Sequence, residues 1–430
     1  MNKKLLIISP YFPPSNTADM QRVRMSLPYF AKYGWDAEVV TVDEQYSDMV
    51  KDDLLLQSIP AGIKIHKVKA LNKKWTSKIG LGSIALRSLW YYKQKVNRLL
   101  KDGKYDLIYF STTQFAVCIL GAYWKKKFGI PYVIDMQDPW HSEYYRDKPK
   151  HQQPPKYWLS YRLNKYMEPI AIKGVDGLIS VSGAYIKQLK SRYAVIKDVP
   201  AATITFGAFK PDMEIAEANK QAFPRLLDTE SINIVYIGRG GADMHKAISP
   251  VFKALQLGLQ NNPKIFQKLK FYFIGTSYAP AGMGKPSILP LAKQYGVEAN
   301  IVEITDRINY YHTLTTLQQA DALFIPGSDD PQYTASKVYP YLLTKKPLLA
   351  IFHPDSSAVG ILKSCTTNVT VLTLDTLSNE TAITLDKTLS AWAAGVFIPV
   401  TLTKEMDNYS AENLTYKQTE LFDKAIHGLN

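Results

Sequence analysis

The chain has 430 residues, of which 46% are hydrophobic and 21% charged, so it can bury a sizeable core and is too long to rely on a single one. This composition excludes a disordered or low-complexity chain and favours an ordinary globular protein of two domains. Lys and Arg outnumber Asp and Glu by 52 to 38, a formal net charge of +14, which favours anionic partners such as phosphates, nucleic acid or anionic lipid without choosing among them.

The first half of the chain alternates between apolar runs of strand length and helical patterns. Residues 1–9 predict a first strand rather than a signal peptide, because Pro10 and Pro13 follow at once without a small-residue cleavage pattern. Residues 18–33 carry apolar side chains at helical spacing, and Gly34 is expected to end that helix. The alternation predicts parallel strands with helical crossovers, the strands being 5–9, 37–42, 63–68, 107–110, 132–135 and 177–181.

The second half repeats this alternation after a polar stretch. Residues 206–231 are rich in Glu, Asp and Lys and contain Pro211 and Pro224, which is typical of a linker. The strands predicted beyond it are 232–238, 271–275, 301–304, 322–326, 348–352 and 369–372. We therefore expect two Rossmann-like, doubly wound α/β domains facing across a cleft. They cover residues 1–210 and 211–410, and a helix in 411–430, which could pack on either domain, is assigned to the first.

Ligands of open parallel sheets bind beyond the carboxyl ends of the strands, so the loops there are where we look for function. The loop SPYFPPSN at 9–16 precedes a helix whose Arg22 and Arg24 could attract phosphate, although an ordinary helix start explains the same residues. In the loop DMQDPWH at 135–141, Asp138 and His141 could bind hydroxyl groups or act as a general base. Alternatively, Asp138 caps the next turn and Trp140 packs.

Two loops of the second half predict an anion site. In YIGRGGADMHK at 236–246, Gly238 allows close backbone approach, and Arg239 and Lys246 add charge where a diphosphate would lie at the start of a helix. The loop lacks the glycine spacing of dinucleotide binders, and the alternative is a glycine-rich turn with a solvated lysine. In the segment 326–347, a helix is expected to start near Thr334. The residues proposed there to hold an anion or sugar hydroxyls are Thr334, Ser336, Lys337 and either Asp329 or Asp330, although helix capping explains the Thr and Ser equally well.

Much of the positive charge lies before Tyr105, interleaved with Trp75, Trp90 and Tyr91. This mixture over residues 73–104 could lie on an anionic membrane, and a solvated helix face with a buried stripe would show the same pattern. We expect nucleic acid not to be the partner, because no recognised binding module accompanies the charge. The basic residues are Lys64, Lys67, Lys69, Lys73, Lys74, Lys78, Arg87, Lys93, Lys95, Arg98, Lys101 and Lys104.

Cys118 and Cys365 are far apart and have no nearby His pair, so we expect neither a disulfide framework nor a metal site. No stretch approaches the roughly 18 to 20 uninterrupted apolar residues that span a bilayer. The sequence therefore predicts a cytoplasmic protein, with peripheral contact to the inner face of the membrane through residues 73–104.

Taken in order, these segments resemble the family 4 glycosyltransferases, retaining enzymes with the two-domain B-type glycosyltransferase fold, over nearly the whole chain. The matching segments are the YFPP loop with its arginine-bearing helix, YDLIYFSTT, GIPYVIDMQDPW, the Glu168 helix leading to VDGLISVSGAY, IVYIGR with Lys246, ADALFIPGS, and SKVYPYLLTKKPLLA. The resemblance implies that Arg239 and Lys246 bind the diphosphate of the donor and stabilise charge on the departing nucleotide, without a metal ion or other cofactor. The family also has two glutamates eight positions apart, and here Gln332 and Pro340 stand in their places.

The resemblance implies retaining transfer of a sugar from a nucleotide-diphosphate donor to a saccharide or lipid-linked acceptor in cell-surface polysaccharide synthesis. Two other interpretations stay open: an epimerase or phosphorylase of the same fold, and a homologue that binds without turnover, which the loss of both glutamates favours. We expect Asp138, His141, Arg239 and Lys246 to be the catalytic residues. The donor would be held by Gly238, Arg239, Lys246, Asp330, Thr334, Ser336 and Lys337.

Overall fold

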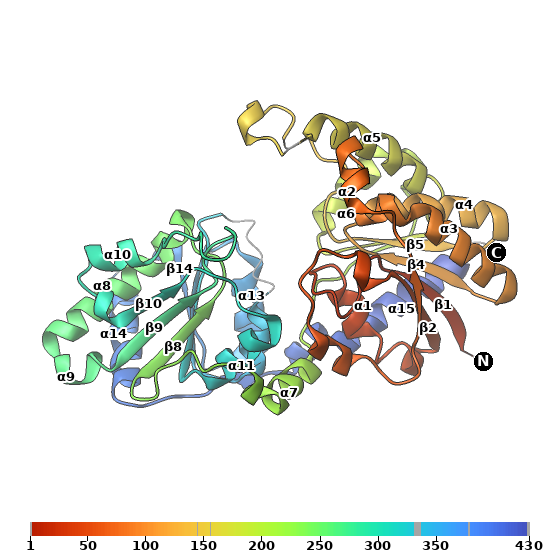
Figure 1. The fold of residues 1–430 in the computed structure, drawn as a ribbon. Helices are drawn as coiled ribbons and strands as arrows, with labels where there is room; N and C mark the ends of the chain where they lie inside the picture. The colour runs from red at the N-terminus through yellow and green to blue at the C-terminus, as the bar shows by residue number, and fades with distance from the viewer. Residues whose placement is uncertain (1, 144, 155, 331–336, 377–378, 428–430) are drawn as a thin grey trace. The chain divides into compact units, whose positions relative to one another are not determined.

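The computed structural model describes residues 2–143, 145–154, 156–330, 337–376 and 379–427 (Figure 1). The chain divides into two compact units, an N-terminal unit of Met1–Gly207 with Tyr409–Asn430 and a C-terminal unit of Ala208–Asn408. Each unit is built around one parallel sheet with helices on both faces. The predicted fold class, two doubly wound α/β sheets, is confirmed.

The N-terminal sheet has the strand order β3-β2-β1-β4-β5-β6-β7. Its strands are β1 (Lys3–Ile8), β2 (Trp35–Val42), β3 (Lys64–Val68), β4 (Leu107–Ser111), β5 (Tyr132–Met136), β6 (Gly177–Ser180) and β7 (Ala201–Thr203). The helices of this unit are α1 (Gln21–Ser26), α2 (Lys73–Thr76), α3 (Ile84–Asp102), α4 (Ile119–Phe128), α5 (Tyr157–Ile172), α6 (Gly183–Arg192) and α15 (Ala411–His427).

The N-terminal strands are apolar on both sides because both faces of the sheet are covered. In β1, Leu6 and Ile8 join the cluster beneath α3, α4 and α5, whereas Leu5 and Ile7 join the cluster beneath α1 and α15. The last helix, α15, contributes Phe422, whose ring lies 4.9 Å from that of Tyr109 and 5.6 Å from that of Trp35. The C-terminal end of the chain therefore completes the core of the N-terminal unit.

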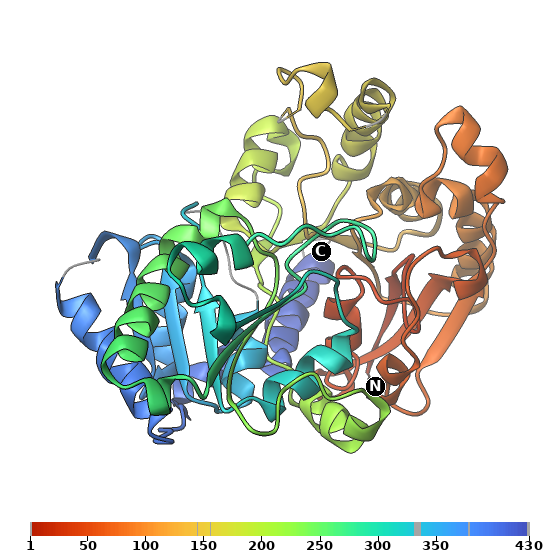
Figure 2. The same cartoon turned by 60° about the vertical axis from the view of Figure 1, so that its left-hand side comes forward.

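The C-terminal sheet has the order β10-β9-β8-β11-β12-β14. Its strands are β8 (Ile232–Ile237), β9 (Leu269–Ile274), β10 (Ile301–Ile304), β11 (Ala322–Pro326), β12 (Leu348–Phe352) and β14 (Thr370–Thr373), and β13 (Thr366–Thr367) pairs separately with β15 (Thr401–Leu402). The helices are α7 (Lys210–Ala218), α8 (His245–Asn261), α9 (Pro263–Phe266), α10 (Leu289–Gln294), α11 (Tyr310–Gln319), α12 (Val338–Leu343), α13 (Ser357–Cys365) and α14 (Asn379–Ala393). Figure 2 shows the crossing helices of this unit from a second direction.

Three expectations were wrong in detail. The helix predicted over 18–33 is the short α1 followed by a separate 3-10 turn, Ala31–Tyr33, because Pro28 has no N–H to donate and cannot continue a helix. Gly34 does end that turn, at a φ of 79°. The polar stretch 206–231 is not simply a linker, since α7 lies within it and its buried Asp212 accepts hydrogen bonds from Tyr310 and Tyr311 at 2.7 and 2.8 Å. The short strand β7 was missed.

Candidate functional site

The order of the C-terminal strands reverses between β8 and β11, and the loops that follow these two strands are tied together. Ser328 Oγ donates to Asp243 Oδ2 at 2.7 Å, and the Asp329 N–H donates to the Asp243 carbonyl at 2.9 Å. A reversal of this kind opens a crevice at the carboxyl edge of a doubly wound sheet, where ligands bind. Two of the loops predicted from sequence to be functional thus meet at one place.

Two glycines shape the loop that follows β8. A Cβ atom on Gly238 would lie 2.4 Å from Lys337 Nζ and 2.5 Å from Tyr236 Oη, so a larger residue does not fit. Gly241 has a φ of 151° and a ψ of 161°, a backbone conformation that is essentially restricted to glycine. The 3-10 turn Ala242–Met244 follows, and the 17-residue helix α8 begins at His245. Met244 and His245 donate their N–H groups to the carbonyls of Gly241 and Ala242, so the turn and α8 form one helical segment. The positive N-terminal end of this segment lies beside the loop.

Arg239 and Lys246, the two cations predicted for this loop, are held by different acids. Arg239 forms a bidentate pair with Asp243, at 3.1 and 2.6 Å, and the guanidinium lowers the pKa of the Asp243 carboxyl group. Lys246 lies in the first turn of α8, and its Nζ is 3.4 Å from Asp329 Oδ2 while 68% of the side chain is exposed. Lys246 is thus free to turn toward a ligand, whereas Arg239 is fixed in place.

Lys337 brings a third positive charge to the same loop. Its ammonium lies 5.8 Å from the centre of the Tyr236 ring. Burial, followed by repulsion from Arg307 and Arg239, lowers the pKa of Lys337 from 10.5 to about 8. Within the described part of the chain the ammonium makes no ion pair and no hydrogen bond. A partly buried cation that is repelled by two others creates a place where a bound anion would be stabilised.

Sequence analysis missed Arg307 and Tyr278, which lie in the loops after β10 and β9. The Arg307 guanidinium is 4.0 Å from the centre of the Tyr278 ring, and 72% of that side chain is exposed. The Asp306 carboxylate fixes the Tyr278 loop by accepting the Gly282 N–H at 3.0 and 3.1 Å. Their position after consecutive parallel strands was the available signal, but neither loop has a distinctive motif.

The rest of the predicted donor site is only partly described. Thr334 and Ser336, with Gln332, lie outside the described residues. Asp330 is the last described residue before that gap, and its N–H donates to Ser328 Oγ at 3.1 Å. Pro340 lies within α12, and the next residue, Tyr341, packs against the end of β8 by accepting the Ile237 N–H at 2.8 Å.

In the N-terminal unit, Asp138 follows β5 and its side chain is exposed. Enough protein lies close to the carboxyl group that partial desolvation, with a smaller contribution from the charge of Asp19, raises its pKa. Asp19 itself is buried and accepts hydrogen bonds from Thr112 and Thr113 at 3.0 and 3.2 Å. Among the residues that the structure describes, none donates a hydrogen bond to the Asp138 carboxylate, which is therefore available to a ligand.

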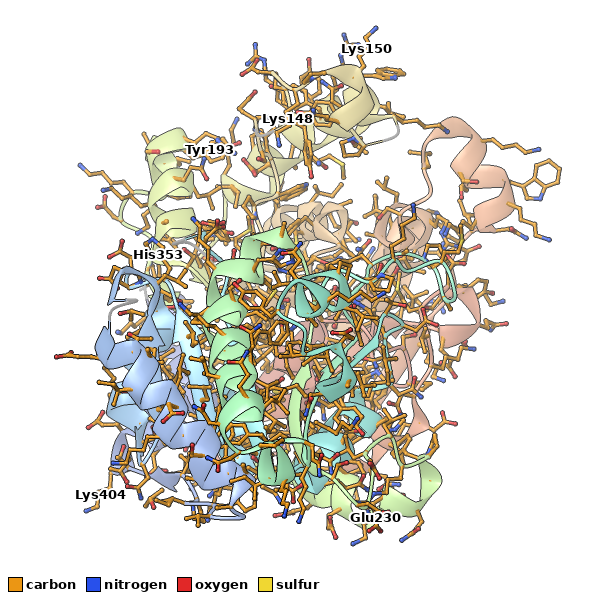
Figure 3. All side chains as sticks on the ribbon, turned by 90° about the vertical axis from the view of Figure 1, so that its left-hand side faces the viewer. Lys148, Lys150, Tyr193, Glu230, His353 and Lys404 are labelled. Carbon is orange, nitrogen blue, oxygen red and sulfur yellow. The ribbon has the colours of Figure 1, made fainter. Side chains whose placement is uncertain are left out.

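His141, three residues on, is buried and held by its backbone. Its N–H donates to Glu168 Oε2 at 2.9 Å, and its carbonyl accepts from Arg192 at 3.0 Å. Glu168 also accepts a hydrogen bond from Tyr193 Oη at 2.8 Å. Tyr193 is labelled in Figure 3. Burial and then the charge of Arg192 lower the pKa of the imidazole. His141 is therefore neutral near pH 7 and could accept a proton, although its ring packs against Tyr161.

The structure contradicts the phosphate role that was left open for Arg22 and Arg24. Arg22 forms a buried pair with Asp135 at 2.6 Å, with side-chain exposures of 3% and 0%, and donates to the Ile204 carbonyl at 2.7 Å. Arg24 donates to Gln21 and Ser58 and is fully buried. The short helix α1 turns both side chains into the core, so neither can reach a ligand at the loop.

Within the described ranges, no three His, Cys, Asp or Glu side chains are grouped so that they could hold a metal ion. Cys118 and Cys365 are both buried, free thiols. Of the helices that the structure describes, none combines the length and apolar character needed to cross a bilayer.

No protein-family model matches the sequence, and no curated protein is similar to it by sequence. Solved structures are similar in fold. A UDP-forming α,α-trehalose-phosphate synthase from Burkholderia xenovorans aligns with a TM-score of 0.52 and 13% identity, over 98% of this chain and 99% of that one. A glycosyltransferase from Rickettsia africae gives 0.52 and 13% over 99% of each chain.

A third similar structure, an Escherichia coli protein described as trehalose-6-phosphate bound with UDP-2-fluoro glucose, has a TM-score of 0.52 and 11% identity, over 98% of this chain and 99% of that one. Identities this low establish the fold and nothing finer. The chain has the two-domain B-type glycosyltransferase fold.

Proposed function

We propose that the chain is a glycosyltransferase that moves a sugar from a nucleotide-diphosphate donor to a saccharide or lipid-linked acceptor. The observation that carries this proposal is the set of cations at the switch point of the C-terminal unit. Arg307 and Arg239 both repel the Lys337 ammonium there, and Asp243 is the carboxylate paired with Arg239. A diphosphate would supply the missing negative charge and accept charge-assisted hydrogen bonds from the cations.

The donor diphosphate lies, in this proposal, between the Gly238 loop and the first turn of α8. The N–H groups of the helix start and Lys246 favour an anion at this point. When the sugar departs, negative charge grows on the nucleotide diphosphate, and Arg239 and Lys246 stabilise it. These residues supply the positive charge in the absence of a metal ion.

Tyr278 provides a flat, exposed surface for the nucleobase, and Arg307 holds the ring in place. Stacking of a base on an aromatic ring contributes about 1–3 kcal/mol. The names of two structures with the same fold support a uridine nucleotide, since one is UDP-forming and the other is bound with UDP-2-fluoro glucose.

The N-terminal unit binds the acceptor in this proposal. Asp138 offers an exposed carboxylate with a raised pKa, and His141 offers a neutral imidazole, so both could take a proton from an acceptor hydroxyl. Retention of configuration, a role in cell-surface polysaccharide synthesis and work at the inner face of the membrane rest on the family resemblance and remain proposals.

A binding protein without turnover is the alternative that one observation favours, because Pro340 in α12 stands where the family has a glutamate. An epimerase or phosphorylase of the same fold would use a similar cleft. An epimerase needs no acceptor, and a phosphorylase uses inorganic phosphate as its acceptor. The reaction products, or their absence, therefore distinguish the three functions.

The proposal is tested by incubating the chain with labelled nucleotide sugars and candidate acceptors, and separating glycosidic product from free sugar. We expect net product from the wild-type chain and a loss of at least about 100-fold in Lys246→Ala, in line with the removal of one group that stabilises transition-state charge. Lys253→Ala, on the same helix, is the control. Full activity of Lys246→Ala would count against the proposed site. An epimer or a sugar phosphate as the sole product would support an epimerase or a phosphorylase, and binding without any product would support the binding protein.

A further inference from the structure

Three tryptophans of the N-terminal unit are exposed to solvent. Of seven tryptophans in the chain, four are buried, whereas Trp75, Trp90 and Trp158 are exposed at 73%, 59% and 63%. Exposed aromatic side chains that gather into one patch mark a surface that binds something, whereas isolated ones do not. Trp75 is in α2 and Trp158 is in the first turn of α5, more than 80 residues apart in sequence.

The turn that follows α2 contacts the start of α5. Lys156 Nζ donates to the Ser77 carbonyl at 2.9 Å. A Cβ on Gly80 would lie 2.1 Å from Leu159 Cδ2, so the Leu159 side chain packs against the backbone at Gly80. The fold thus joins two exposed tryptophans into one region, which we call the α2–α5 surface.

The α2–α5 surface continues along one stripe of α5. Trp158, Arg162, Tyr166 and Ile170 recur every four residues, and all four are exposed. Residues four apart lie on the same side of a helix. The helix therefore presents three large apolar or aromatic side chains and one cation to solvent, where a helix on a globular surface is normally polar.

The charge on this surface is mainly positive, although Lys73 pairs with Asp48 and Tyr161 donates a hydrogen bond to Glu143. Residues 72–81 and 156–167 contain six Lys and Arg and no Asp or Glu. Lys78 lies 5.3 Å from the Trp75 ring and Arg162 lies 5.9 Å from the Trp158 ring. Lys150, on the neighbouring segment, also points outward (Figure 3). The remaining cations of the two segments are Lys73, Lys74, Lys156 and Lys165, all exposed.

We propose that the α2–α5 surface docks on an anionic lipid bilayer. Tryptophan and tyrosine settle at the boundary between headgroups and acyl chains, and Lys and Arg beside them reach lipid phosphates. Each basic side chain near an anionic surface strengthens binding, and the attraction is screened by salt. The inference goes beyond the proposed transfer reaction and does not depend on it, because all its residues lie in the N-terminal unit.

This placement differs from the region 73–104 expected from sequence. Arg87 of α3 is buried and donates to the carbonyls of Leu71 and Tyr46 at 2.8 and 2.9 Å. Among the aromatic residues of α3, Tyr92 is buried and Trp90 is the exposed tryptophan. Compared with the predicted region 73–104, the α2–α5 surface therefore includes α5, which was not predicted from the sequence, and less of α3.

The test is sedimentation with vesicles of phosphatidylcholine, with and without phosphatidylglycerol, at low and high salt. We expect the full chain to bind the anionic vesicles and to be released by salt. Trp75→Ala/Trp158→Ala should weaken binding by about tenfold or more, as should Lys78→Gln/Arg162→Gln. Trp90→Ala is the matched control and should bind like the wild type. All variants change exposed side chains, and circular dichroism checks their folding.

Four results of the vesicle assay would overturn the proposal: no binding to vesicles, equal binding to neutral and anionic vesicles, unchanged binding of both double variants, or a loss confined to Trp90→Ala. A loss confined to Trp90→Ala would mean that the membrane contact lies on α3 instead. Preferential binding to a polynucleotide, with none to vesicles, would identify a different partner and also overturn it. Titration of each variant with a nucleotide reports separately on the C-terminal unit, so failure here is distinguishable from failure of the proposed transferase.

Discussion

Replacing Lys337 by methionine should stabilise the ligand-free protein. Burial and two neighbouring arginines lower the pKa of this lysine from 10.5 to about 8. A lowering of that size costs the charged form about 3 kcal/mol, and below pH 8 the folded protein bears this cost in full. Since the pKa is lower in the folded chain than in the unfolded chain, wild-type stability rises between pH 8 and 10.5. At pH 7 we expect Lys337→Met to raise the free energy of unfolding by roughly 1–3 kcal/mol, because partial solvent contact reduces the effect.

The same substitution should weaken binding of a nucleoside diphosphate. A hydrogen bond to a charged group contributes about 1.5–3 kcal/mol, which corresponds to a loss of roughly 10- to 150-fold. Wild-type affinity should be constant below pH 8 and fall above it, as the Lys337 ammonium loses its proton. The variant should lack this fall. Greater stability combined with weaker binding is the signature of a charge that is kept for its ligand.

Chemical denaturation at pH 7 and calorimetric titration with uridine diphosphate between pH 6.5 and 9.5 measure the two effects. Lys253→Met, which removes an exposed charge from α8, is the control for methionine substitution. Equal affinity of Lys337→Met and wild type at pH 7, or the same pH dependence in both, would refute the reasoning. A fall in stability without a change in affinity would show that Lys337 is structural.

Three further substitutions test other parts of the account. Tyr278→Ala should weaken uridine diphosphate binding by about tenfold and leave inorganic pyrophosphate binding unchanged, as measured by calorimetry; an equal loss for both would exclude stacking. Gly238→Ala should lower the free energy of unfolding by about 1–3 kcal/mol and abolish nucleotide binding, because the new methyl group displaces the buried Tyr236; normal binding would show that the loop adapts. Arg22→Met should destabilise the N-terminal unit by about 3–5 kcal/mol in chemical denaturation, since it leaves the buried Asp135 carboxylate without its cation; a near-neutral effect would mean that the hydrogen bonds from Ser111 and Gln137 are enough to hold it.

The strands were predictable because a sheet that is covered on both faces requires continuous apolar runs. Three strands of the C-terminal sheet, Ile301–Ile304, Ala322–Pro326 and Leu348–Phe352, have the predicted bounds, and most others differ by one or two residues. The first helix was predicted too long because its apolar spacing continues past Pro28, where the backbone cannot. Strand β7 was missed because Ala201–Thr203 is short and only partly apolar.

The roles of side chains were harder to predict from the sequence than the bounds of helices and strands. Arg22 and Arg24 share a helix near a ligand loop, but spacing alone could not show that α1 points both into the core. Lys337 was expected to hold an anion through a helix start, whereas its partly buried position beside Tyr236 depends on chain segments far apart in sequence. The pairing of Tyr278 with Arg307 depends in the same way on two loops that only the sheet order brings together.

The central claim is that the C-terminal unit holds a nucleotide-diphosphate sugar, and calorimetric titration of the full chain with a panel of nucleotide sugars tests it without knowledge of the acceptor. The account predicts that at least one binds with a dissociation constant of about 1 μM to 1 mM, and that Arg239→Ala weakens binding by tenfold or more. Failure of every nucleotide sugar to bind, or equal binding by Arg239→Ala, would contradict it.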